Sequence, residues 1–162
     1  MKPAAALLML VLVGAAPPPV PVPASAAAPV LARVTLGDIR VQLFYRHSGT
    51  LSGNVAQPGR THLWNTVVGE GDAKEPADDA LVTVGLKGGQ PDMVTDLPLI
   101  VTARAGGRVI ASRSFSGILL PLQGQAWSAL WLPNVTCRNR VTIDVSYGVQ
   151  KKATFVNFDC GE

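Results

Sequence analysis

The sequence is dominated by short runs in which apolar and polar side chains alternate. Residues 33–46 show this pattern most clearly: every second side chain from residue 39 to residue 45 is apolar, and Arg40 and Gln42 lie between them. A period of two residues is that of a β-strand with one buried face. Gly37 and Asp38 interrupt the run near its start and predict a bulge or a turn there.

Further runs of strand character recur along the chain, separated by loops rich in Gly, Pro and Asp. They occupy residues 63–68, 80–86, 99–115, 119–122, 127–132 and 137–160. Residues 99–115 predict a hairpin that turns at Gly106 and Gly107. No segment after residue 26 keeps a helical period over ten residues. We therefore predict an all-β fold of about seven strands, an antiparallel β-sandwich with immunoglobulin-like or C2-like topology; a small β-barrel is the alternative.

The last predicted hairpin contains the only two cysteines of the chain, Cys137 and Cys160. A two-residue turn at Gly148 and Val149 would pair residues whose numbers sum to 297, which places the cysteines directly opposite each other. A four-residue turn would shift the sum to 299 and match apolar side chains better. Both registers leave the cysteines on one face, because they differ by two residues. A disulfide is therefore expected in either case.

Residues 1–26 have the three parts of a secretory signal peptide. Lys2 supplies a positive start, residues 7–13 form an apolar run, and residues 24–26 are small side chains suited to cleavage. The apolar run is shorter than the roughly 20 residues of a transmembrane helix. We therefore predict a cleaved signal peptide at 1–26 and a single β-sandwich domain at 27–162. The mature chain would be exported to the periplasm or the extracellular space, with no transmembrane segment, which also permits the disulfide.

One polar loop, residues 69–79, holds five of the 11 acidic residues of the chain. Calcium favours carboxylate and carbonyl oxygens from loops, so this loop is a candidate calcium site. Its ligands would be Glu70, Asp72, Asp78 and Asp79. Acidic residues of loop 87–97 would add to the site if both loops lay at the same end of the sandwich. The spacing fits no EF-hand, and acidic residues also suit turns for conformational reasons.

Trp127 and Trp131 would share one face of the predicted strand 127–132. The interpretation that we favour is that these rings fill the core or cover an open edge of a sheet. If they were exposed, they would form an aromatic platform suited to stacking sugar rings or to gripping a partner protein.

The sequence contains no recognisable catalytic motif. It lacks a nucleophile elbow, and both cysteines are assigned to the disulfide. His47 and His62 lack the further ligands of a typical zinc site. The formal net charge of +3 is mild, and no basic cluster is interleaved with aromatic residues, which does not favour nucleic acid.

We therefore expect a non-catalytic, exported module that binds or supports a protein or glycan at the cell envelope. The sequence also leaves two alternatives open. One is a calcium-stabilised adhesion or glycan-binding module that uses the acidic loop 69–79. The other is a hydrolase whose site is not evident from the sequence.

Overall fold

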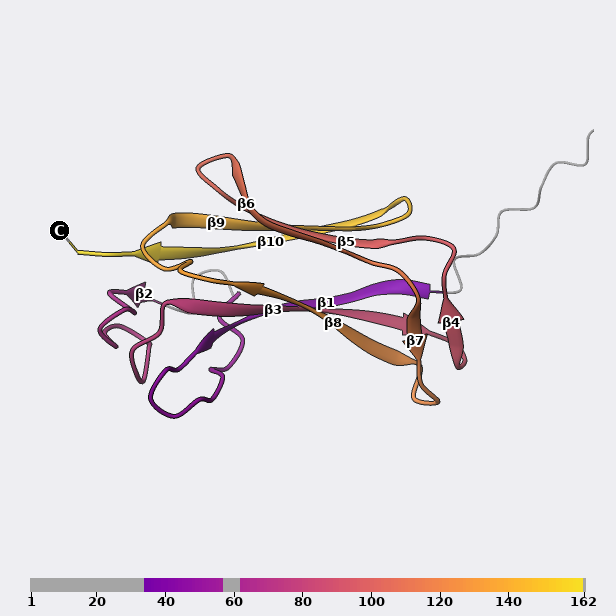
Figure 1. The fold of residues 1–162 in the computed structure, drawn as a ribbon, viewed down its shortest axis with the longest axis horizontal. Helices are drawn as coiled ribbons and strands as arrows, with labels where there is room; N and C mark the ends of the chain where they lie inside the picture. Colours follow the sequence, from indigo (N-terminus) through magenta and orange to yellow (C-terminus); the bar gives the residue numbers. More distant parts are fainter. Residues whose placement is uncertain (1–33, 57–61, 162) are drawn as a thin grey trace, which may run out of the picture. The chain divides into compact units, whose positions relative to one another are not determined.

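The computed structural model describes residues 34–56 and 62–161, which form one compact unit (Figure 1). These residues contain ten strands and no helix. The strands are β1 (Val34–Phe44), β2 (Leu63–Trp64), β3 (Asp79–Gly88), β4 (Asp92–Val94), β5 (Leu99–Ala105), β6 (Arg108–Phe115), β7 (Ile118–Leu120), β8 (Gln125–Leu132), β9 (Asn139–Tyr147) and β10 (Gln150–Asp159).

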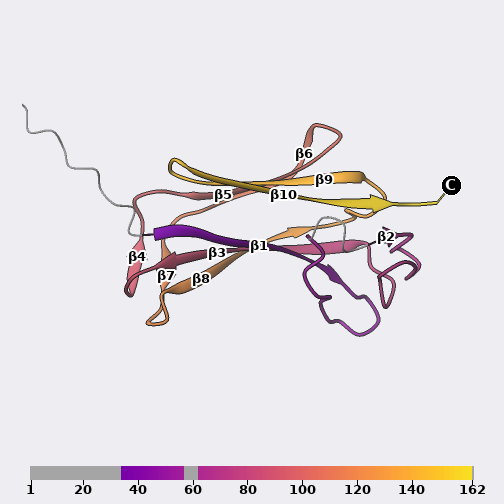
Figure 2. The same cartoon turned by 180° about the vertical axis from the view of Figure 1, so that it is seen from behind.

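The strands form two main sheets, which Figures 1 and 2 show as two layers. One layer has the order β1-β3-β8, and the other has the order β2-β10-β9-β5-β6. All long neighbours are antiparallel, and only the two-residue β2 runs parallel to β10. The short strands β4 and β7 pair with each other. The sheets are not closed into a barrel, so the predicted all-β antiparallel sandwich is confirmed.

Seven of the ten strands have at least seven residues, and their order is immunoglobulin-like. The first, second and fifth long strands form one sheet, and the third, fourth, sixth and seventh form the other. In an immunoglobulin constant domain the fourth strand lies beside the fifth. Here β6, the fourth long strand, pairs with β5 in the opposite sheet.

The core lies between the two sheets and follows the alternation of the strands. In β1 and β9, every second side chain is buried, as with Val41 and Leu43 in β1 and Ile143 in β9. The predicted interruption of β1 is a bulge, where the register with β3 shifts between Leu36 and Ile39.

The hairpin of β9 and β10 adopts the two-residue turn. Tyr147 pairs with Gln150, so paired numbers sum to 297, and Gly148 has a φ of 56°. Val149 has no positive φ, which fits a type II′ turn with glycine at its first central position. The predicted disulfide between Cys137 and Cys160 joins the two chain segments beyond the open end of this hairpin.

The register places polar side chains of β10 on the inner face, where they bind the free edge of β1. The Gln150 side chain accepts a hydrogen bond from the Leu36 amide and donates one to the Val34 carbonyl, both at 2.9 Å. Lys152 Nζ donates to the carbonyl of Gly37 in the bulge at 2.7 Å. These contacts connect the two sheets at one side of the sandwich.

The predicted signal peptide lies outside the described residues. Within the part of the chain that the structure does describe, no helix has the length and hydropathy needed to cross a membrane.

Replacing both Cys137 and Cys160 by alanine should lower the free energy of unfolding by about 3 kcal/mol, because the unfolded chain is no longer closed into a loop. Urea unfolding would measure this difference. A reducing agent should destabilise the native protein and leave the stability of the variant unchanged. If the native protein with its disulfide intact were no more stable than the variant, the structural role of the bond would be contradicted.

The substitution Gln150→Ala should lower the free energy of unfolding by about 1–3 kcal/mol, because it leaves two buried backbone groups of β1 without partners. Val149→Ala is the control, since the neighbouring Val149 side chain is 97% exposed. Its effect should stay within about 0.5 kcal/mol. Equal losses in the two variants would show that the side-chain amide does not hold the edge of β1.

Candidate functional site

The outer face of the three-stranded sheet carries two large aromatic side chains on β8, separated by one outward-facing row of the ladder. Trp131 lies opposite Leu81, which pairs with Gln42. Trp127 lies opposite Gly85. The row between them joins Arg40, Thr83 and Ala129, and the row beyond Trp127 joins Thr35, Lys87 and Gln125. We call this surface, made by Phe44, Leu81, Trp127, Ala129 and Trp131, the aromatic face.

The Trp127 ring packs over Gly85 of the central strand. A Cβ on Gly85 would lie 3.4 Å from two atoms of the Trp127 ring, which is ordinary contact distance. The guanidinium carbon of Arg40, from the far strand of the sheet, lies 4.2 Å from the centre of the same ring. The ring is therefore positioned by side chains and backbone of all three strands.

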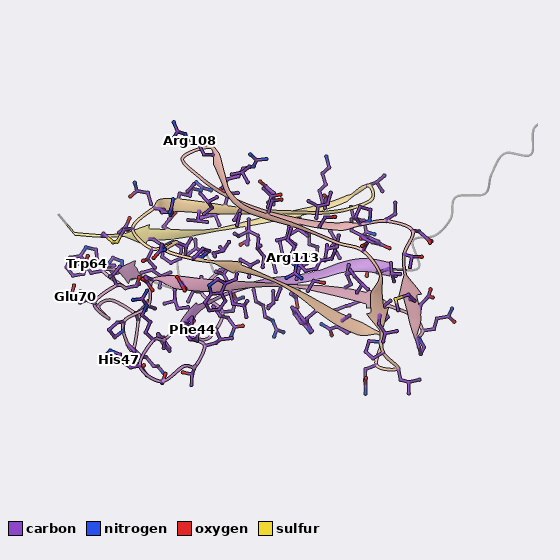
Figure 3. The ribbon with its side chains drawn as sticks, in the orientation of Figure 1. Phe44, His47, Trp64, Glu70, Arg108 and Arg113 are labelled. Carbon is purple, nitrogen blue, oxygen red and sulfur yellow. A yellow bond between two sulfur atoms is a disulfide. The ribbon has the colours of Figure 1, made fainter. Side chains whose placement is uncertain are left out.

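Trp131 is positioned by an aromatic neighbour. Its ring centre lies 5.2 Å from that of Phe44, at an interplanar angle of 65°, an edge-to-face geometry that aromatic pairs favour. Figure 3 shows Phe44 on the side of β1 that faces away from the larger sheet.

Both tryptophans remain partly accessible to solvent. Trp127 is 39% exposed and Trp131 is 41% exposed, so neither ring fills the core, which was one half of the interpretation favoured from sequence. Both rings do lie on β8, an edge strand of its sheet, as the other half of that interpretation expected. Trp64 has a similar exposure of 38%, but it lies at the far end of the domain on β2 (Figure 3). The three tryptophans therefore form one pair and one isolated ring.

Each of the candidate carboxylates in the acidic loop 69–79 bonds to a different partner within the protein. Glu70 accepts a hydrogen bond from the Asn65 amide at 2.9 Å. Asp72 accepts one from the backbone amide of His62.

The other two candidate calcium ligands also have their own partners. Asp78 pairs with Arg46, and Asp79 accepts a hydrogen bond from the Asn134 backbone amide at 2.8 Å. The described residues contain no group of three or more His, Cys, Asp or Glu side chains arranged to hold a metal ion. The four candidate calcium ligands are thus not brought together.

The second acidic loop cannot supply further ligands to the first. Loop 69–79 leads into β3 and loop 87–97 follows it, so a ten-residue strand of about 33 Å separates them. Asp92 and Asp96 act instead on Tyr147. Burial of Tyr147 raises its pKa above the ordinary value, and the charges of Asp96 and Asp92 raise it further.

The remaining sequence candidates and the main groove lie elsewhere. His47 and His62 are both exposed in loops.

An open groove of about 520 Å³ lies on the outer face of the larger sheet, where Arg104 pairs with Asp144 at 3.3 Å. Its lining includes Ile100, Thr102, Arg104, Asp144, Ser146 and Lys151.

The two tryptophans of the aromatic face could be identified from the sequence, but Phe44, Arg40 and Gly85 could not be identified as their neighbours. The alternation in β1 places Arg40 on the outer face, and that was visible from sequence. Its approach to Trp127 depends on pairing across two strand ladders, for which a single sequence carries no local signal.

The sequence matches no protein-family model, and no curated protein matches it either.

Millimolar calcium should leave the melting temperature of the protein unchanged, because the acidic side chains of loop 69–79 are engaged one by one. Thermal unfolding with calcium and with a chelator would measure this. A rise in melting temperature that grows with calcium concentration would show a site that binds the folded state, and would contradict this expectation.

Proposed function

We propose that this protein is an exported, non-catalytic β-sandwich module that binds a glycan through its aromatic face. The observation that carries the proposal is that the side chains of Trp127 and Trp131 lie on the outer face of one sheet, where both are partly exposed to solvent. A sugar ring has an apolar face and a polar periphery, so it suits an aromatic surface surrounded by hydrogen-bonding groups. Thr83, Gln125 and Arg40 supply such groups beside the two rings.

The spacing of the rings favours an oligomeric ligand. Trp127 and Trp131 are four residues apart on one strand, which separates their Cα atoms by about 13 Å. A ligand that contacts both must extend along β8. A chain of linked sugars meets this requirement, whereas a single sugar does not.

The size of the aromatic face favours a glycan over a protein partner. The ladder rows from Asp79 to Lys87 span about 27 Å along the strands and about 10 Å across them. Such a surface is long and narrow, whereas a standard protein interface buries about 800 Å² of accessible surface on each partner. A narrow, extended ligand therefore matches the surface better.

Export is supported by the disulfide, since such bonds persist in oxidising compartments. The signal-peptide pattern of residues 1–26 agrees with this location. The module would act at the cell envelope or outside the cell.

Trp131→Ala and Trp127→Ala should each weaken glycan binding about 10-fold, because each removes a ring on which a sugar stacks. A glycan microarray would identify a bound oligosaccharide, and titration calorimetry would give the affinities. Trp64→Ala is the matched control, since Trp64 is exposed to the same degree at the far end of the domain.

Circular dichroism and melting temperature should confirm that all three variants fold. Retention of glycan binding in the Trp127→Ala, Trp131→Ala double variant would contradict the proposal. Binding of a partner protein to this face, with no glycan bound by the protein, would also contradict the proposal.

A further inference from the structure

Two cationic side chains lie on the same face as the tryptophans, and a third lies at the edge of their strand. Arg40 stacks on Trp127 from β1, and Lys87 extends from the ladder row beyond that ring. Arg113 lies at the free edge of β8, where its Nη1 donates to the Ala129 carbonyl at 3.3 Å. Figure 3 shows Arg113 between the two layers, beside the strand that carries both tryptophans.

These three cations have no carboxylate partner in the described part of the chain. The ion pairs found there are Arg46 with Asp78 and Arg104 with Asp144, neither of which belongs to the aromatic face. Among the ladder rows from Leu81 to Lys87, the one acidic residue is Asp38, which the bulge of β1 places beside Gly85, in the row of Trp127. Asp38 forms no ion pair with these cations, and Asp79, in the row of Phe44, accepts a hydrogen bond from the Asn134 backbone amide.

Arg40 is held in place while its polar atoms stay available. A guanidinium above an aromatic ring gains about 0.5–1 kcal/mol at an exposed site, which restrains its orientation. Within residues 34–56 and 62–161, no hydrogen-bond acceptor contacts the guanidinium of Arg40. Its N–H groups can therefore receive a carboxylate in a two-point contact.

We propose that the ligand of the aromatic face is an acidic glycan whose sugars carry carboxylate groups, an inference that rests on the proposed glycan-binding function. Sugar rings lie along Trp131 and Trp127, and carboxylates reach Arg40 and Lys87. The ladder rows of Arg40 and Lys87 are four residues apart, about 13 Å, with Trp127 between them. The cations would thus contact acidic groups of different sugars in one chain.

The groove on the larger sheet is a weaker candidate for the same ligand. Its Arg104 is already paired with Asp144, and no aromatic ring lines it. Its Lys151 offers a matched control, because removing that charge changes the net charge of the protein by the same amount as removing Arg40.

The test uses an array of carboxylate-bearing oligosaccharides, each printed beside its neutral methyl ester, with the full mature protein. Wild-type protein should bind acidic members and lose most of this binding on their methyl esters. Affinity for the acidic members should fall as salt rises, because exposed charges are screened. Arg40→Gln and Lys87→Gln should each weaken binding between about 3-fold and 10-fold, and Lys151→Gln should not change it.

The outcomes separate this inference from the proposed function. Equal binding of acids and esters, weakened by Trp131→Ala but not by Arg40→Gln, would overturn the acidic ligand and leave glycan binding intact. A loss with Lys151→Gln but not with Arg40→Gln would assign the acid to the groove of the larger sheet and overturn the inference. Binding of no member of the array, acidic or neutral, would overturn both.

Discussion

The register of the β9–β10 hairpin is the constraint on which the rest of the structure depends. It makes Gln150 the first residue of β10, on the inner face with Lys152, and both side chains bind the backbone of β1 across the sandwich. The C-terminal half of β1 is covered separately, since the Asn54 and Ser52 side chains accept hydrogen bonds from its amides. Side chains thus bond the backbone groups along the outer edge of β1. The other edge strand of the three-stranded sheet is β8, which carries both tryptophans.

The aromatic face follows from this arrangement. β8 contributes both tryptophans, β3 contributes a glycine where Trp127 crosses it, and β1 contributes Phe44 and Arg40. Each ring therefore depends on a contact from a distant strand. Arg40 and Lys87 lie on the same face as the rings, while most acidic residues of the described chain lie in loops or at strand ends at the two ends of the domain, with Asp38 and Asp144 as exceptions within strands. Stacking surface and charge together describe a face suited to an extended, acidic ligand.

Much of the fold could be predicted from sequence because it depends on local patterns. Alternation predicted β1 and β9, and paired glycines predicted the turn between β5 and β6, where Gly106 and Gly107 both have positive φ. The register at Gly148 could not be chosen, because apolar matching favoured the other alternative. In the observed register Gln150 pairs with Tyr147, and its side chain bonds the backbone of β1, which is far away in sequence. For the same reason the exposure of the tryptophans could not be predicted: it depends on which sheet face β8 presents to solvent, and that is a property of the whole sandwich.

The most direct test of a ligand-binding aromatic face is the two-dimensional NMR spectrum of the three tryptophan indole N–H groups during titration with an acidic oligosaccharide. We predict that the Trp127 and Trp131 signals shift together and saturate, while the Trp64 signal stays in place. A shift of the Trp64 signal alone, or of none of the three, would contradict a ligand site on this face.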